Sequence, residues 1–425
     1  MAEFTAAVYQ NEFLPDGGTD VNAIVTVTCS GAGVAGQSGS GSAGEIIIVD
    51  TSGSMGTETM AAAREAAKAA VAEILDGTWF AVIAGSDKAA LAYPRVTSGP
   101  GLVKMGPETR AEATRAVDQF VASGGTAMST WLDLAVTLFE SVPEVNQRHA
   151  ILLTDGENRE DGGKLDGAIR RATGVFQCDC RGAGTDWVVE EVRRISQALL
   201  GTVDIIPSPA DMQEQFKAMM QTAMSRGVAD AQLRVWTPQG AQVLFVRQVS
   251  PTVEDLTARR TDINPLTGAY PTGAWSDESR DYHVGVRVAA KAIGQEQLAA
   301  RVQLALGDDV ACQGLVKATW SNNSELTTRI DQQVAHYTGQ TELAAMIQEG
   351  LAAKAAGDEA TATTKLGRAV QLAAETGNDE ATSKLRKVVD IDDEKEGTVR
   401  LKAAVNKADE MALDTASTKT TRIKK

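Results

Sequence analysis

Short apolar runs rich in β-branched residues alternate with amphipathic stretches over residues 45–226. The runs are apolar at consecutive positions, which is typical of strands covered on both faces. The stretches between them carry apolar residues at helical spacing, and Thr57 to Leu75 is dense in the strong helix formers Ala and Glu. The pattern predicts strands at 45–49, 79–84, 90–96, 150–155, 174–180 and 202–206, and helices at 57–75, 107–121, 131–139, 164–172, 186–200 and 209–226. Such alternation indicates a doubly wound, mostly parallel α/β sheet with helices on both faces.

A different pattern flanks this region. Residues 1–30 and 227–321 contain short runs in which apolar and polar residues alternate, with turn sequences between them. Alternation with period two is typical of half-buried antiparallel strands. We therefore expect an antiparallel β-sandwich into which the α/β domain of residues 45–226 is inserted. Residues 31–44 are rich in Gly and Ser and predict a flexible linker; a phosphate-binding loop is disfavoured because the stretch precedes a strand rather than following one.

The C-terminal part is rich in Ala and predicts a helical domain over residues 322–413. Gly357-Asp358 and Gly377-Asn378 interrupt the helical pattern as turns, and Asp390–Glu396 has the composition of a charged hinge. The tail, residues 414–425, is expected to be disordered. The expected helices lie at 331–337, 342–356, 359–376, 379–389 and 398–413.

Composition narrows the range of partners and compartments. The chain has 425 residues, with 41 Lys and Arg against 56 Asp and Glu and a net charge of −15, which argues against a nucleic-acid or anionic-membrane surface. Because the N-terminus lacks the features of a signal peptide and no apolar run approaches about 20 residues, we expect a cytoplasmic protein. Cys178-Asp-Cys180 could be half of a zinc or redox site, but no second pair or His lies at ligand spacing, which favours buried free thiols.

Candidate chemistry follows the first strand of the α/β region. Asp50, Ser52 and Ser54 form a D-x-S-x-S sequence, and open α/β sheets bind their ligands at the carboxyl ends of strands. One carboxylate and two hydroxyls at alternate positions can converge on a hard cation such as Mg²⁺, which prefers about six oxygen ligands. The same pentapeptide can also be a simple helix N-cap turn.

Two later segments favour the cation. Thr126 follows Gly124-Gly125, and Asp155 ends a second buried-strand pattern, so that each supplies one more oxygen at the same sheet edge. Over about residues 44–226 the chain thereby resembles the von Willebrand factor A domain, in which a metal-ion-dependent adhesion site combines D-x-S-x-S, a Thr after glycines, and an Asp in a T-D-G turn. The resemblance implies Mg²⁺ or Mn²⁺ bound directly or nearly so by Ser52, Ser54 and Thr126, and directly or through water by Asp50 and Asp155.

The residues around this site do not favour catalysis. The chain has three histidines, His149, His283 and His336, none of them in a motif, so each is expected to be structural and the site lacks a water-activating base. Glu157 and Asn158 follow Asp155 and are expected on the rim of the site, where they could help to select a partner.

We therefore expect a non-enzymatic, Mg²⁺-dependent protein-interaction module of a bacterial multidomain type, whose partner offers an Asp or Glu to the metal. An alternative is an accessory subunit of an ATPase or chelatase-like remodelling machine; the chain has no Walker motif, so the partner would supply the nucleotide chemistry. A third hypothesis is a metal-assisted phosphoesterase.

Overall fold

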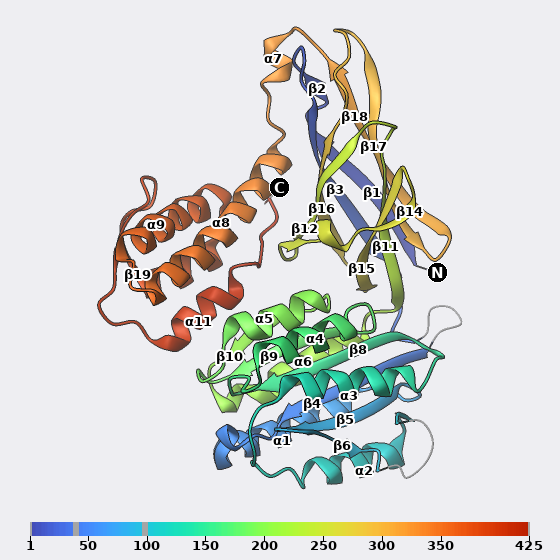
Figure 1. Cartoon of the computed structure of the whole chain (residues 1–425), viewed down its shortest axis with the longest axis vertical. Helices are drawn as coiled ribbons and strands as arrows, with labels where there is room; N and C mark the ends of the chain where they lie inside the picture. Colours follow the sequence, from blue (N-terminus) through green and yellow to red (C-terminus); the bar gives the residue numbers. More distant parts are fainter. Residues whose placement is uncertain (1, 37–41, 96–100, 424–425) are drawn as a thin grey trace. The chain divides into compact units, whose positions relative to one another are not determined.

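The computed structural model describes residues 2–36, 42–95 and 101–423 (Figure 1). Two compact units divide this chain. The first unit comprises Ala32–Ala229 together with Gly273–Ser276, and the second comprises Ala2–Gly31, Asp230–Thr272 and the residues from Asp277 onward.

A seven-stranded sheet forms the centre of the first unit, in the order β10-β9-β8-β4-β5-β6, with β7 paired to β5. The strands from β10 to β5 run parallel to their neighbours, whereas β6 and β7 run antiparallel to β5. The α/β prediction of a doubly wound, mostly parallel sheet is confirmed. The strands are β4 (Ser42–Asp50), β5 (Trp79–Gly85), β6 (Ala89–Tyr93), β7 (Val103–Lys104), β8 (Val145–Thr154), β9 (Gln177–Ala183) and β10 (Val203–Ile206).

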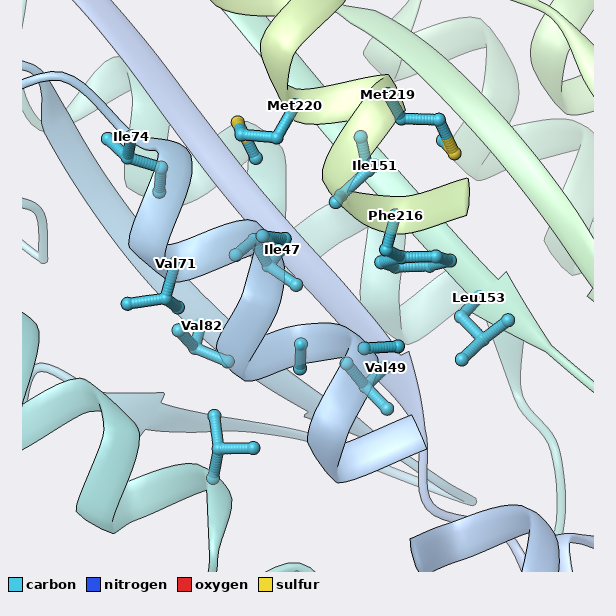
Figure 2. Packing of buried hydrophobic residues seen from close by; sticks show 14 of the residues in the cluster. Ile47, Val49, Val71, Ile74, Val82, Ile151, Leu153, Phe216, Met219 and Met220 are labelled. Carbon is cyan, nitrogen blue, oxygen red and sulfur yellow. The ribbon is translucent and has the colours of Figure 1, made fainter. Parts of the chain in front are cut away.

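Helices cover both faces of this sheet because consecutive strand residues point to opposite sides. Ile47 and Val49 of β4 pack in one core with Val71 of α1 and Phe216 of α6 (Figure 2). The intervening Ile48 is buried on the other face, where α3 packs on β4. The helices are α1 (Gly56–Glu73), α2 (Pro107–Val117), α3 (Met128–Glu140), α4 (Gly162–Ala172), α5 (Val189–Ala198) and α6 (Met212–Met224).

Several boundaries in the first unit differ from the sequence prediction by a few residues; β8 begins at Val145 rather than at 150, and β9 covers Gln177–Ala183 rather than 174–180. β4 begins at Ser42, so residues 42–44 of the expected linker are part of the central strand. Ala32 and Ala35 of the same stretch are buried, and residues 37–41 lie outside the described residues. Small side chains that suit a flexible linker also suit a close-packed strand, which explains the error. The helix expected to reach residue 121 ends at Val117.

Two sheets make up the sandwich, whose residues belong mostly to the second unit. Their orders are β1-β3-β16-β12-β13 and β14-β15-β11-β17-β18-β2, and β2 joins its neighbour β18 in parallel. β3 precedes the α/β region in the sequence and β16 follows it, yet the two strands pair with each other, as expected for an insertion. The strands are β1 (Glu3–Gln10), β2 (Phe13–Leu14), β3 (Asp20–Ser30), β11 (Val228–Trp236), β12 (Gln242–Ser250), β13 (Glu254–Asp255), β14 (Thr261–Asn264), β15 (Thr267–Trp275), β16 (Ser279–Arg287), β17 (Glu296–Leu306) and β18 (Asp309–Trp320).

The C-terminal part is helical, but several expectations for it are wrong. The helices expected at 331–337 and 342–356 are one continuous helix, α8. The helix expected at 398–413 is instead a strand followed by a helix, because Val399 packs into the helical core as half of a hairpin. That hairpin also contains the expected charged hinge. The elements are α7 (Ser324–Thr327), α8 (Gln332–Ala355), α9 (Glu359–Thr376), α10 (Asp379–Val388), β19 (Val389–Asp393), β20 (Thr398–Leu401) and α11 (Lys407–Ala416).

The tail expected to be disordered is ordered as far as residue 423. α11 extends to Ala416, and Lys419 forms a bridge with Thr252. Arg422 lies 3.1 Å from the buried carboxylate of Asp281, to which Tyr337 of α8 also donates. Long-range pairing of polar residues holds this segment, and composition alone does not reveal such pairing.

Candidate metal site

Two adjacent parallel strands bring the predicted residues to one edge of the α/β sheet. β4 ends at Asp50, and β8 ends at Thr154, immediately before Asp155. Because β4 and β8 are paired in parallel, their carboxyl ends meet. Ser52 and Ser54 lie in the short turn that leads from β4 into α1.

Asp50 is fully buried and held at both oxygens. Its Oδ1 accepts a hydrogen bond from the Ser52 backbone N–H at 2.7 Å, and its Oδ2 accepts one from the Thr154 hydroxyl at 2.7 Å. Burial raises the pKa of Asp50 although these hydrogen bonds oppose the rise. Thr154 was not among the predicted site residues; its position just before Asp155 in the strand is the signal that could have identified it.

A chain of side-chain oxygens connects the two strand ends. The hydroxyls of Ser52 and Ser54 are 2.9 Å apart, and Ser54 donates to Asp155 Oδ1 at 2.7 Å. Burial raises the pKa of Asp155 to about 6; the hydrogen bond from Ser54 opposes this rise, and the charges of Asp50 and Asp186 add to it.

Thr126 completes the group. A Cβ atom added to Gly156 would lie 2.9 Å from the Ser54 hydroxyl oxygen and 3.1 Å from that of Thr126, so both hydroxyls face the same point. The backbone holds Thr126 there, because Arg159 N–H donates to the Thr126 carbonyl at 2.9 Å and Gly53 N–H donates to the Gly124 carbonyl at 2.9 Å. The structure thus brings all five predicted site residues together.

The two predicted rim residues differ from each other. Glu157 is exposed, whereas the side-chain oxygen of Asn158 accepts a hydrogen bond from Met128 N–H at the start of α3 at 3.1 Å. Asn158 therefore fastens the loop after β8 to α3. Glu160, which sequence reasoning missed, does the same by accepting from the backbone N–H and the hydroxyl of Ser129 at 2.9 Å and 2.6 Å. Neither role has a sequence signal, because each partner lies about 30 residues away.

The donor set fits a hard divalent cation. Two carboxylates and three hydroxyls supply oxygen only, the ligand type that Mg²⁺ and Mn²⁺ prefer. In the described part of the chain no Lys, Arg or His forms an ion pair with Asp50 or Asp155. Nor do the described residues contain a cluster of three or more His, Cys, Asp or Glu arranged to hold a metal, so any cation here depends on the hydroxyls.

A second charged cluster lies within the same strands, about five residues before their carboxyl ends. His149 of β8 is buried between Glu45 of β4, at 2.7 Å from Nδ1, and Asp179 of β9, at 2.9 Å from Nε2. Arg226 lies 3.3 Å from Asp179. Burial lowers the pKa of His149, but the two carboxylates outweigh it and raise this pKa to about 9. His149 is therefore a structural histidine, as expected, although it lies inside the strand rather than before it.

The cysteines on β9 fit the expected buried thiols. Cys178 and Cys180 are fully buried, and their sulfur atoms are 3.8 Å apart. Within the described residues, no helix is long and apolar enough to cross a membrane.

A parallel sheet with an oxygen-rich site at its carboxyl edge defines a class of metal-binding α/β domain. The von Willebrand factor type A domain matches residues 45–205, and the von Willebrand factor type A C-terminal domain matches residues 371–417. A solved structure, von Willebrand factor type A from Catenulispora acidiphila, is 46% identical, with a TM-score of 0.93 over 99% of this chain and 97% of that one. The chain belongs to the von Willebrand factor type A family.

Two further relatives are more distant. The ArnB paralog VWA2 from Sulfolobus acidocaldarius is 14% identical and shares the fold over 98% of each chain, with a TM-score of 0.57. An uncharacterized protein from Synechocystis sp. is 25% identical over 222 residues, which is 50% of each chain, so the chain spans about half the length of this curated relative. Domains of this family commonly mediate protein interactions.

Proposed function

We propose that this protein is a non-enzymatic, Mg²⁺-dependent protein-interaction module whose metal-ion-dependent adhesion site takes a carboxylate from a partner protein. The observation that supports this most directly is the convergence of Asp50 and Asp155 with three hydroxyls, while no Lys, Arg or His of the described residues forms an ion pair with either carboxylate.

The chemistry of the donors explains why a partner would be needed. Neutral hydroxyls leave more of the ion's charge unbalanced than carboxylates do, and aspartates that act through water leave still more. A cation held in this way attracts an anionic ligand from outside. Ser54 is exposed, so a carboxylate on another protein can reach this side of the site.

The absence of a histidine among the site residues supports a binding role. None of the five site residues is a histidine, and His149, the histidine of the α/β unit, is paired with Glu45 and Asp179 in the interior of the sheet. Metal-assisted hydrolysis needs a group that activates water, by accepting its proton or by a second metal.

Isothermal titration of the full chain with Mg²⁺ and with Mn²⁺ tests the metal site. One binding site is expected in the wild type and none in Asp50→Asn, while Asp133→Asn, which removes an exposed carboxylate paired with Arg171, serves as the matched control and keeps the site. Pulldown from lysate in Mg²⁺ or in EDTA then tests the partner. Equal Mg²⁺ binding by wild type and Asp50→Asn would contradict the proposal.

A further inference from the structure

One aliphatic side chain stands out in the loop that leads to the site residue Thr126. Val121 is 68% exposed. Among the described residues of the α/β unit, the other large hydrophobic side chain with substantial exposure is Leu75, at 36%. Single exposed aliphatic residues are common on protein surfaces, so exposure alone indicates nothing. Val121 is notable because of its position in the chain.

The loop that carries Val121 is fixed on both sides. Phe120 is buried, and its carbonyl accepts hydrogen bonds from the Arg64 guanidinium, with Nε at 3.0 Å. Ala122 packs against the core next to α1. Because the residues before and after it point inward, Val121 is turned outward and its own packing contributes little to the fold.

The same loop joins the metal site directly. Ser123 N–H donates to the Thr51 carbonyl at 2.8 Å, and the Gly124 carbonyl accepts from Gly53 at 2.9 Å. Thr51 and Gly53 flank the site residue Ser52. Since consecutive Cα atoms are about 3.8 Å apart, Val121 lies within about 8 Å of Ser123 along the chain. Val121 is therefore two residues from the segment that is hydrogen-bonded to both neighbours of Ser52.

We infer that Val121 is a partner-contact residue: the surface around the metal site fits a protein segment that presents a carboxylate to the cation and an aliphatic side chain, one or two residues away, to Val121. This inference rests on the proposed function and specifies the partner's chemistry. The positive ion selects the carboxylate. The exposed Val121 selects the aliphatic neighbour, because contact removes apolar surface of both side chains from water.

Short peptides of defined sequence test this inference. The probes are fluorescein-labelled octapeptides of Gly and Ser with one Asp and one Leu, the Leu placed one or two positions before or after the Asp, and matched peptides with Ser for Leu or Asn for Asp. Fluorescence anisotropy measures their binding to the full chain in Mg²⁺. For at least one Leu position, Leu is expected to bind about tenfold more tightly than Ser to the wild type, equivalent to about 1.4 kcal/mol.

Val121→Ser is expected to reduce that Leu preference to about twofold or less and to leave the Mg²⁺ affinity and the melting temperature unchanged. Leu75→Ser is the matched control: Leu75 follows the C-terminal end of α1, far from the turn that holds Ser54, and its substitution should keep the preference. The inference would be overturned if Leu gave no tighter binding than Ser at any of the four positions, or if the Leu preference were equal in wild type and Val121→Ser. In either case, binding that requires Asp and Mg²⁺ would still support the proposed function. If no peptide binds in a manner that requires both Asp and Mg²⁺, the proposed function and this inference fail together.

Discussion

Two regions of the central sheet carry similar acidic residues in opposite electrostatic settings. In the interior of the strands, Glu45 and Asp179 surround His149, and Arg226 adds a second positive charge. At the carboxyl ends of the strands, the neighbours of Asp50 and Asp155 are hydroxyls and backbone N–H groups. The same two strands, β4 and β8, contribute to both regions.

This difference separates a structural cluster from a binding site. A buried carboxylate whose charge is balanced within the fold contributes to stability when its geometry is good, and its loss leaves unpaired charge behind. A buried carboxylate without a nearby cation has a raised pKa, and binding of a proton or a metal ion stabilises it. Burial raises the pKa of Asp179, but Arg226 and His149 outweigh it and hold this pKa well below its usual range. Burial raises the pKa of Asp50, and it also raises the pKa of Glu45, although His149 and Arg226 oppose that rise.

The largest expected effect is the loss of Asp179. Asp179→Ala removes the partner of His149 and Arg226 and leaves Thr202, whose N–H and hydroxyl both donate to Asp179 at 2.7 Å, without its acceptor. We expect the free energy required to open the sheet to fall by about 3–5 kcal/mol, as measured by hydrogen exchange of the β8 and β9 amides. Asp133→Ala breaks an exposed ion pair with Arg171 and should cost less than about 1 kcal/mol. Similar losses in the two variants would contradict the assignment of a structural cluster.

The next effect depends on pH. The pKa of His149 is raised from 6.5 to about 9 in the folded protein, so protonation stabilises the fold fully below about pH 6.5, and this contribution is lost as the pH rises to about 9. The free energy of unfolding should fall by about 3 kcal/mol across that interval. Urea denaturation at a series of pH values measures it. His149→Gln should lack this slope, and an unchanged slope in that variant would show that other groups cause it.

The third expected effect is stabilisation of the fold by Mg²⁺ bound at the carboxyl ends of the strands. At a concentration about 100 times the dissociation constant, a ligand that binds only the folded state stabilises it by about 2.7 kcal/mol. Thermal unfolding of the wild type should shift upward in Mg²⁺, and Asp50→Asn should show no shift because it removes one of the two carboxylates. Asp179→Asn, which leaves the site residues intact, should retain the shift. A shift of equal size in Asp50→Asn would place the ion elsewhere.

The smallest effect concerns the space beside the hydroxyls. The Cβ of Gly156→Ala would press on Ser54 and Thr126, which must then move by a few tenths of an ångström. We expect Mg²⁺ affinity to fall about tenfold, equivalent to about 1.4 kcal/mol. Gly163→Ala is the matched control, since no atom lies within 4 Å of its added Cβ. Titration calorimetry compares the two, and unchanged affinity in Gly156→Ala would mean that the hydroxyls are not ligands.

The site was more predictable than its surroundings. Asp50, Ser52, Ser54, Thr126 and Asp155 follow strands or glycines whose sequence patterns are strong, and the structure brings them to one edge. Asn158, predicted on the rim of the site, accepts a hydrogen bond from Met128 N–H, a contact that no local pattern indicates. The expected helix at 398–413 failed because a strand of four residues, β20, is too short to show a clear period.

The sequence by itself determined the order of strands and helices in the α/β domain, its insertion in the sandwich, and the edge of the sheet where the site lies. It could do so because the spacing of apolar residues reports locally which side of each element is buried. Only the tertiary structure decided which charges are balanced. Glu45, His149, Asp179 and Arg226 meet across about 180 residues of chain, and Thr154 reaches Asp50 across 104. No local pattern encodes such pairings, because they depend on the register and neighbours of strands that are distant in sequence.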